Sequence, residues 1–168
     1  KVEATEGGIG VPTVPVVSHE IGQYATFPNL EETVKYTGVL KAYNFEVFGE
    51  RMAEAGIRHL AKDYFEQSGR LAVDCYKEEM EAAFRSQHLA GFQMLDLQDF
   101  SGQGMAFVGL LDPFMESKGL ITPESWREYC DDAVLLGRFD DYHFVGGCSM
   151  TGNNILSVDV SVAYYRYD

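Results

Sequence analysis

A candidate reactive carboxylate lies near the start of the chain. The segment 14–20 is a β-branched run that ends in His19 and Glu20, and Gln23 and Tyr24 follow one glycine later. Parallel-sheet enzymes place catalytic groups at the carboxyl ends of buried strands, which is where this pattern puts Glu20. The neighbouring side chains can orient a carboxylate or bind hydroxyl groups. The alternative is that Glu20 only ends the strand and is hydrated.

A second group of polar side chains follows a later apolar run. Gln93, Asp96 and Asp99 lie in or just after the segment 91–99, and Asp96 stands between two leucines. A carboxylate buried in such a run must be paired or hydrogen-bonded, because its desolvation is otherwise costly. These side chains either cap local backbone groups or accept hydrogen bonds from substrate hydroxyls.

The elements expected to position these residues alternate in type. The two segments that carry the polar groups read as strands buried on both faces, as in a parallel sheet. Helical spacing predicts three helices between them, the second and third separated at Ser68-Gly69, and a Thr-Pro-Glu start predicts a fourth. Further along the chain, apolar and polar residues alternate, which predicts antiparallel strands. The helices are expected at 44–55, 58–66, 70–88 and from 122, and the strands within 133–145 and 156–162.

Charge and composition exclude several classes of function. The chain of 168 residues has 26 acidic and 13 basic side chains, a formal net charge of -13, so nucleic acid is not an expected partner. No stretch of apolar residues is long enough for membrane insertion. The three cysteines and four histidines show no metal-ligand spacing. We therefore expect no metal site and no cofactor.

Three stretches of sequence resemble one enzyme family. PVVSHEIGQY, GFQMLDLQDFSGQG and SKGLITPESWREYC are similar to the late catalytic barrel of bacterial glycoside hydrolase family 2-like multidomain enzymes. A complete barrel of this kind needs about 200 to 250 residues. The resemblance thus implies an α/β chain that is the C-terminal part of a (β/α)₈ TIM barrel followed by the start of a β-sandwich. Residues 1–132 would carry barrel strands seven and eight, and residues 133–168 would begin the sandwich.

The resemblance also implies a function. Glu20 occupies the place of the family's nucleophile in a retaining glycoside hydrolase that cleaves oligo- or polysaccharides. The family's acid/base belongs to an Asn-Glu pair, a dipeptide that this sequence lacks. Carbohydrate and the remainder of a longer polypeptide are the implied partners, the implied location is periplasmic or secreted, and the isolated chain is expected to be inactive. The implied substrate-binding residues are His19, Gln23, Tyr24, Gln93, Asp96 and Asp99.

Two other interpretations stay open at this point. The chain could be a noncatalytic carbohydrate-binding or degenerate barrel domain, which would keep a cleft without an acid/base residue. It could also be a small α/β interaction domain in which Glu20 is structural. The last interpretation predicts a chain that folds alone with a cooperative melt, whereas a barrel segment would expose apolar strand edges and aggregate.

Overall fold

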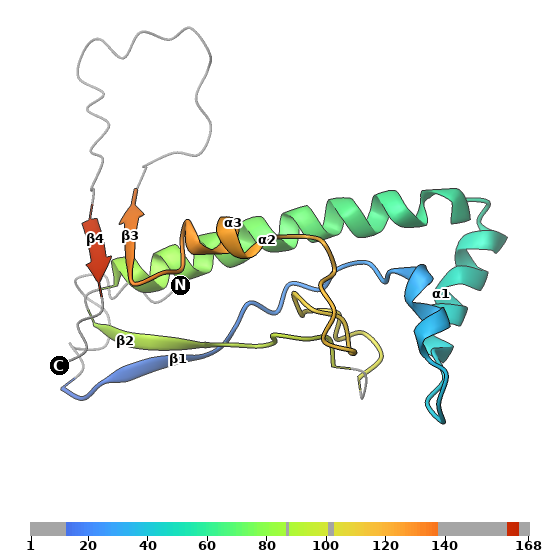
Figure 1. Ribbon diagram of the computed structural model, residues 1–168, viewed down its shortest axis with the longest axis horizontal. Helices are drawn as coiled ribbons and strands as arrows, with labels where there is room; N and C mark the ends of the chain where they lie inside the picture. Colours follow the sequence, from blue (N-terminus) through green and yellow to red (C-terminus); the bar gives the residue numbers. More distant parts are fainter. Residues whose placement is uncertain (1–12, 87, 101–102, 138–160, 165–168) are drawn as a thin grey trace, which may run out of the picture.

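One long helix, α2 (Ala61–Arg85), runs along the length of the molecule (Figure 1). The computed structural model describes residues 13–86, 88–100, 103–137 and 161–164. With 25 residues, α2 is about 37 Å long. Its buried positions recur every three or four residues and so form one stripe along the helix: Phe65, Gly69, Ala72, Tyr76 and Met80.

The predicted break between two helices at Ser68-Gly69 is wrong. Helix α2 continues through both residues, which make hydrogen bonds and packing contacts within and beside it. The Ser68 hydroxyl donates to the Tyr64 carbonyl at 2.6 Å and accepts from the Phe27 N–H at 2.7 Å. A Cβ on Gly69 would lie only 2.3 Å from Cδ2 of Leu120. Gly69 is therefore a point of close packing rather than a helix end.

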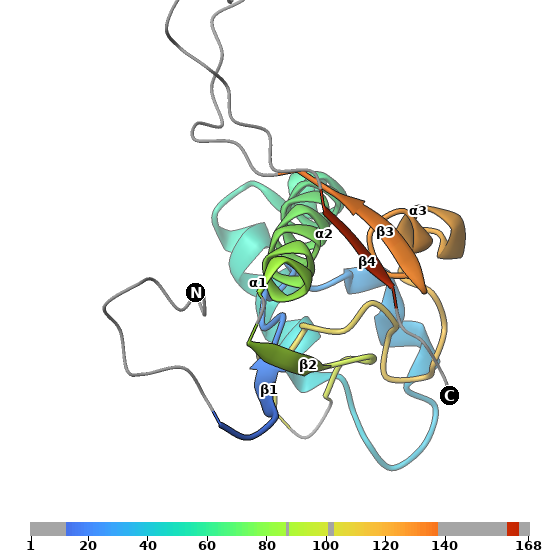
Figure 2. The same ribbon diagram turned by 90° about the vertical axis from the view of Figure 1, so that its left-hand side faces the viewer.

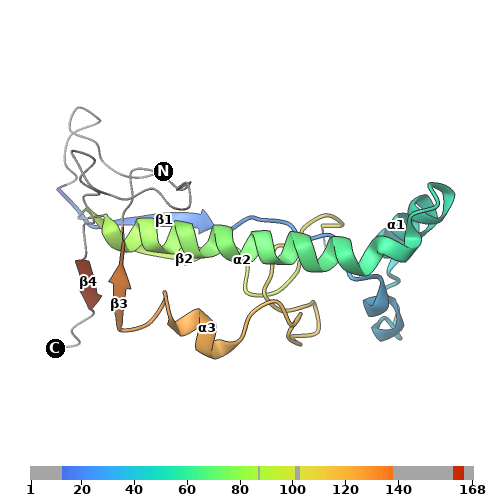
Figure 3. The same cartoon turned by 90° about the horizontal axis from the view of Figure 1, so that it is seen from above.

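Two parallel strands lie beside the C-terminal half of α2. Strand β1 (Val16–Ile21) pairs with β2 (Leu89–Met94), so that Val16 is opposite Leu89 and Ile21 is opposite Met94. The expected parallel pairing of the two polar-ended runs is confirmed. The view from above shows α2 lying over both strands, with α1 beyond one end and β3 and β4 at the other (Figure 3).

The expected barrel segment is wrong. In a (β/α)₈ barrel every strand has a neighbour on both sides, but among the described residues β1 and β2 pair only with each other. Three of the six side chains of β1 are exposed, including Val17 at 51%, so the strand is not buried on both faces. The described chain is a small mixed α/β structure with a two-stranded parallel sheet.

The expected β-sandwich is replaced, in the described residues, by one antiparallel pair. Strand β3 (Ala133–Leu136) pairs with β4 (Ser161–Tyr164), and both contact α2. Figure 2 shows this pair and the β1–β2 pair on adjacent sides of the helix. The alternating residues 156–160 lie outside the described part. The short helix α3 (Pro123–Arg127) begins as predicted, since Thr122 Oγ1 accepts from the Ser125 N–H at 3.2 Å.

An aromatic cluster fills the other end of the molecule. Helix α1 (Tyr43–Glu54) packs its buried face on the 3₁₀ helix η1 (Leu30–Lys35), and a second 3₁₀ helix, η2 (Arg58–Leu60), leads into α2. The rings of Phe45 and Phe107 lie 5.2 Å apart in an edge-to-face contact. As predicted, α1 ends at Gly56, whose φ of 72° is in the left-handed region.

The segment 95–118 folds back on itself between the strands and α1. Leu110 N–H and Leu111 N–H both donate to the Leu97 carbonyl, and Asp99 N–H donates to the Leu111 carbonyl. Gly109 lies inside this fold, where a Cβ would be 2.2 Å from the Gln98 carbonyl carbon. Only glycine allows the two stretches of backbone to approach so closely.

Gly109→Ala should therefore destabilise the fold. The added methyl meets backbone rather than a movable side chain, so we expect a loss of about 1–3 kcal/mol in the free energy of unfolding. Urea denaturation followed by circular dichroism measures this loss. The matched control is Gly38→Ala, whose Cβ would meet nothing within 4 Å. Equal effects of the two substitutions would contradict this account of the packing.

Candidate functional site

Glu20 stands at the end of β1 in an unusual backbone conformation. Its φ of 54° lies in the left-handed region, which costs a non-glycine residue about 1 kcal/mol or more. Gly22 follows with a φ of 85°, so the chain turns sharply after the strand. The Glu20 side chain is 49% exposed, which leaves its carboxylate accessible from solvent.

Two neighbouring side chains hold the Glu20 carboxylate. Gln23 Nε2 donates to Glu20 Oε2 at 3.2 Å and also lies 3.3 Å from the Glu20 carbonyl oxygen. On the other side, His19 Nε2 lies 3.2 Å from Glu20 Oε1. The carboxylate is therefore oriented by one amide and one imidazole.

His19 also connects β1 to β2. Its Nδ1 is 2.8 Å from Oε1 of Gln93 on the neighbouring strand. A neutral imidazole has one N–H, whereas the imidazolium has two. With two N–H groups, the imidazolium can donate to the Gln93 oxygen and to the Glu20 carboxylate together.

A cleft of about 270 Å³ opens beside this turn. Gln23 lines this cleft, and its side chain also donates to the Glu20 carboxylate. A single hydrogen bond therefore joins the carboxylate to the cleft lining. Asp96 contributes the acidic group of the lining, and its Oδ1 accepts from the Leu97 N–H at 3.1 Å. The remaining lining residues are neutral: Ala25, Leu95, Phe100, Gln103, Met105, Ala106 and Val108.

One wall of the cleft combines apolar surface with exposure. Phe100 and Met105 are 55% and 63% exposed although both are large and apolar. Such side chains offer a flat surface on which the apolar face of a ring can pack. Together with Gln23, Gln103 and Asp96, they give the cleft the mixture of apolar walls and few polar groups that is typical of small-ligand sites.

The remaining predicted site residues lie away from this cleft. Asp99 is 3% exposed and does not line the cleft; it accepts from the Gly109 N–H at 2.9 Å and from the Lys118 ammonium at 2.7 Å. Tyr24 is half-buried, and its ring packs edge-on against Tyr76 with centroids 5.7 Å apart. Of the predicted binding residues, the structure thus places Gln23 and Asp96 in the cleft.

Asp99 belongs to a buried group of charged side chains whose other members the sequence did not single out. The Lys118 side chain is 1% exposed and pairs with Asp99. Burial raises the pKa of Asp99 and lowers the pKa of Lys118, while the attraction between the two charges opposes both shifts. Lys118 also lies 3.3 Å from Thr26 Oγ1, so the pair ties the segment after β1 to residues 99 and 118.

Lys35 and Asp112 form a second pair next to the first. Lys35 donates to Asp112 and, at 2.7 Å, to Glu116. Burial works against ionisation of Asp112, but hydrogen bonds from Lys35 and from two backbone N–H groups outweigh it and lower its pKa. The same bonds to Asp112 and Glu116 raise the pKa of Lys35.

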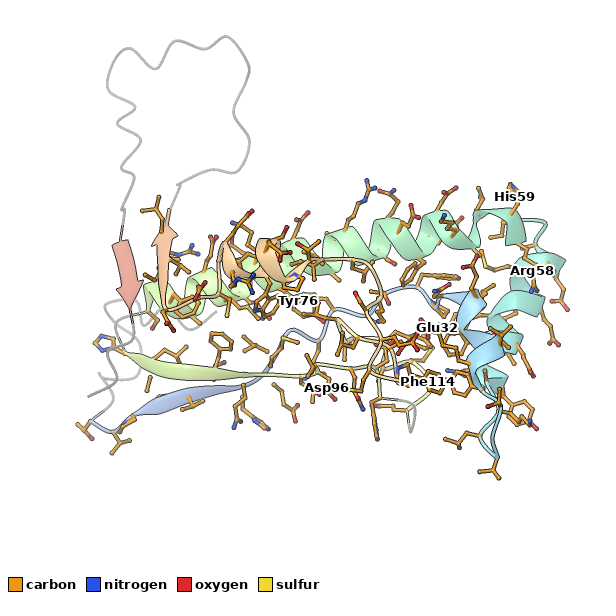
Figure 4. The ribbon with its side chains drawn as sticks, viewed as in Figure 1. Glu32, Arg58, His59, Tyr76, Asp96 and Phe114 are labelled. Atoms are coloured by element: carbon orange, nitrogen blue, oxygen red, sulfur yellow. The ribbon has the colours of Figure 1, made fainter. Side chains whose placement is uncertain are left out.

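Glu32 completes this group and is not matched by a cation of its own. It is 3% exposed, and its Oε2 is buried without a hydrogen-bond partner in the described structure. Burial first, and then the negative charges of Asp112 and Asp99, raise its pKa to about 7. Figure 4 shows Glu32 on η1, beside the folded segment 95–118.

Other kinds of site are not found in the described residues. Residues 13–86, 88–100, 103–137 and 161–164 contain no group of three or more His, Cys, Asp or Glu side chains suited to a metal ion. Within the same ranges no helix has the length and apolar character needed to cross a membrane. Comparison with models of known protein families and with curated proteins found no match.

The raised pKa of Glu32 predicts a pH-dependent stability. An unfolded Glu ionises near pH 4.5, whereas folded Glu32 keeps its proton to about pH 7. The stability it contributes is thus complete below about pH 4.5 and is lost as the pH rises to 7, by a few kcal/mol at most. Glu32→Gln should remove this loss and make the chain more stable than wild type at pH 8.

Urea denaturation at pH 5 and pH 8 measures this effect. The control is Glu50→Gln, which changes an exposed carboxylate on α1 and should leave the pH dependence of wild type in place. If Glu32→Gln and wild type lose the same stability between the two pH values, Glu32 is ionised in the folded protein and the inference is wrong.

Proposed function

We propose that Glu20 is the nucleophile of a retaining glycoside hydrolase and that the neighbouring cleft binds the sugar. The likeness of PVVSHEIGQY to the nucleophile strand of family 2-like enzymes motivates this assignment. The observation that carries it is the bridge made by Gln23, which bonds the accessible Glu20 carboxylate and also lines the cleft. A carboxylate oriented beside a sugar-sized cleft is what the first step of a double displacement needs.

The proposed reaction has two displacements at one carbon. In the first, a Glu20 carboxylate oxygen attacks the anomeric carbon, and the bond from that carbon to the leaving oxygen breaks. The leaving oxygen takes the bonding electron pair and a proton from the acid/base residue. In the second, water attacks the same carbon, the acid/base residue takes a proton from the water, and Glu20 leaves as a carboxylate.

The acid/base residue is expected from sequence other than this chain. The family's Asn-Glu dipeptide is not present in the 168 residues. The chain itself would contribute the nucleophile, its orientation by His19 and Gln23, and part of the sugar site. Asp96 would accept hydrogen bonds from sugar hydroxyls, while Phe100 and Met105 would pack against the apolar face of the ring.

The charges around the cleft favour an uncharged or cationic sugar. Asp96 lines the cleft, Glu20 is adjacent, and the lining holds no Lys, Arg or His among the described residues. A sugar carboxylate or sulfate in this position would be repelled and would find no cation to bind. The formal net charge of -13 adds to the same preference at longer range.

Carbohydrate binding without cleavage is the second candidate. It is favoured by one observation, that the cleft lining includes Asp96 and Gln23 but not Glu20 itself. In this case Glu20 would orient Gln23 for hydrogen bonding to a bound sugar. The two candidates differ in whether Glu20 forms a covalent bond, and that difference can be measured.

Covalent labelling tests the nucleophile directly. A 2,4-dinitrophenyl 2-deoxy-2-fluoro glycoside has a leaving group that needs no proton, so the first displacement can proceed without the acid/base residue. We expect a panel of such glycosides to label the chain at Glu20, with release of dinitrophenolate. Intact mass and peptide mapping by mass spectrometry measure the label.

Glu20→Gln should abolish the label, and Glu46→Gln, an exposed glutamate on α1, should keep it. A label found on another residue, or no label with any glycoside of the panel, would count against Glu20 as nucleophile. Sugar binding without labelling would instead favour the noncatalytic candidate.

Asp96→Asn tests the preference for uncharged sugars. In wild type we expect a methyl glycoside to bind more tightly than the matched methyl uronide, which differs only in its carboxylate. Removing the Asp96 charge should narrow this difference by about fivefold, since a charge pair at 4 Å is worth about 1 kcal/mol in water. Ligand-observed NMR titration at low and high salt measures both affinities. An unchanged ratio would contradict the role of Asp96.

A further inference from the structure

Helix α2 holds the turn that carries Glu20. The backbone N–H of Gly22 donates to Oε2 of Glu79 at 2.7 Å, across 57 residues of sequence. Gly22 has a φ of 85°, and Glu20 has a φ of 54°, so the turn is in a conformation that the chain does not favour by itself. A specific partner is needed to keep it there, and Glu79 supplies that partner.

Glu79 makes a second contact with the same turn. Burial first, and then the nearby Glu79 carboxylate, raise the pKa of the Tyr24 hydroxyl, which belongs to the same turn. The Glu79 carboxylate is half-buried and accepts from the N–H of Gly22, the residue immediately before Gln23. Because Gln23 is the residue that bonds Glu20, Glu79 fixes the backbone from which that bond is made.

Tyr76, one turn earlier on α2, completes the support. It is 2% exposed, and a Cβ on Gly22 would lie 2.4 Å from its ring carbon Cε1, so the turn rests directly on the ring. Its hydroxyl donates to the carbonyl of Val108, which lines the cleft. Figure 4 shows Tyr76 on the side of α2 that faces the strands.

We propose that Glu79 and Tyr76 are positioning residues for the candidate site, Glu79 for the Glu20 turn and Tyr76 for the separation of the two cleft walls. This inference rests on the proposed function of Glu20. Neither side chain lines the cleft, so both act through the backbone that they hold. Their effects should therefore separate: Glu79 governs the rate of attack by Glu20, and Tyr76 governs the affinity for the sugar.

Glu79→Met and Glu79→Gln form the matched pair that tests the first role. Methionine keeps the length of the side chain and removes the acceptor, whereas glutamine keeps an acceptor for the Gly22 N–H. With the fluoroglycoside probe, we expect Glu79→Met to lower the maximal labelling rate by about tenfold to a hundredfold, with little change in the probe's inhibition constant. Glu79→Gln should restore most of the rate. Equal rates for wild type and Glu79→Met would overturn the proposal.

Tyr76→Phe tests the second role. The ring remains beneath Gly22 and only the hydroxyl bond to Val108 is lost. We expect the probe's inhibition constant to rise about fivefold, the effect of one hydrogen bond, while the maximal labelling rate stays near that of wild type. A lower maximal rate with an unchanged inhibition constant would contradict the assignment of Tyr76 to the cleft walls.

Amide hydrogen exchange gives a measurement that does not depend on labelling. In the full chain without probe, the Gly22 N–H should exchange at least about tenfold faster in Glu79→Met than in wild type or Glu79→Gln, because only the Met variant lacks an acceptor. If only the proposed function is wrong, wild type will not be labelled, but Gly22 will still exchange faster in Glu79→Met than in the other two proteins. Equal Gly22 exchange in all three proteins would overturn the role of Glu79, whatever the labelling.

Discussion

The buried ion pair between Lys118 and Asp99 is the interaction on which the shape of the cleft depends. Lys118 lies 2.7 Å from Asp99, 3.3 Å from Thr26 Oγ1 and 3.4 Å from the Phe107 carbonyl. These partners belong to the segment after β1 and to both ends of the loop that forms one cleft wall. Removing either charge would leave the other buried without a partner, which costs about 3–5 kcal/mol. The pair therefore holds this loop in place relative to the segment after β1.

Helix α2 supplies the other fixed reference for the site. Two residues of its buried stripe pack against other segments: Gly69 against Leu120, and Tyr76 against Gly22. One rigid helix thus fixes the position of Leu120 relative to the turn that carries Glu20. A pair of parallel strands without further partners is a marginal structure in water. The helix compensates for this by covering one face of the pair along its length.

Local signals were predictable from the sequence, and signals that depend on distant residues were not. Thr122 and Gly56 act on backbone groups within a few residues, so the helix start and the helix end that they mark are confirmed. Ser68-Gly69 carries the same kind of signal, yet α2 continues through it because Leu120 and Phe27 use those residues for packing and hydrogen bonding. Tertiary contacts of this kind override local propensity.

The candidate site shows the same division. The position of Glu20 at the end of a strand and its closeness to Gln23 follow from neighbours in sequence, and both were predicted. Asp96 and Asp99 could not be assigned different roles, because both lie in or just after the same apolar run and the sequence does not show which of them is buried. Their different environments depend on Lys118, which lies 19 residues beyond Asp99 and carries no motif.

The acidic residues of this chain perform different tasks because their surroundings differ. Glu20 is half-exposed and is held by the Gln23 amide and the His19 imidazole, which leaves its carboxylate oriented and accessible. Glu79 is half-buried and accepts from the backbone N–H of Gly22, which makes it a support for the turn. Glu32 is buried without a donor for Oε2 and keeps its proton to about pH 7. The net charge of the chain thus assigns no role to any single carboxylate, because the donors around each one determine whether it reacts, supports the backbone or stays protonated.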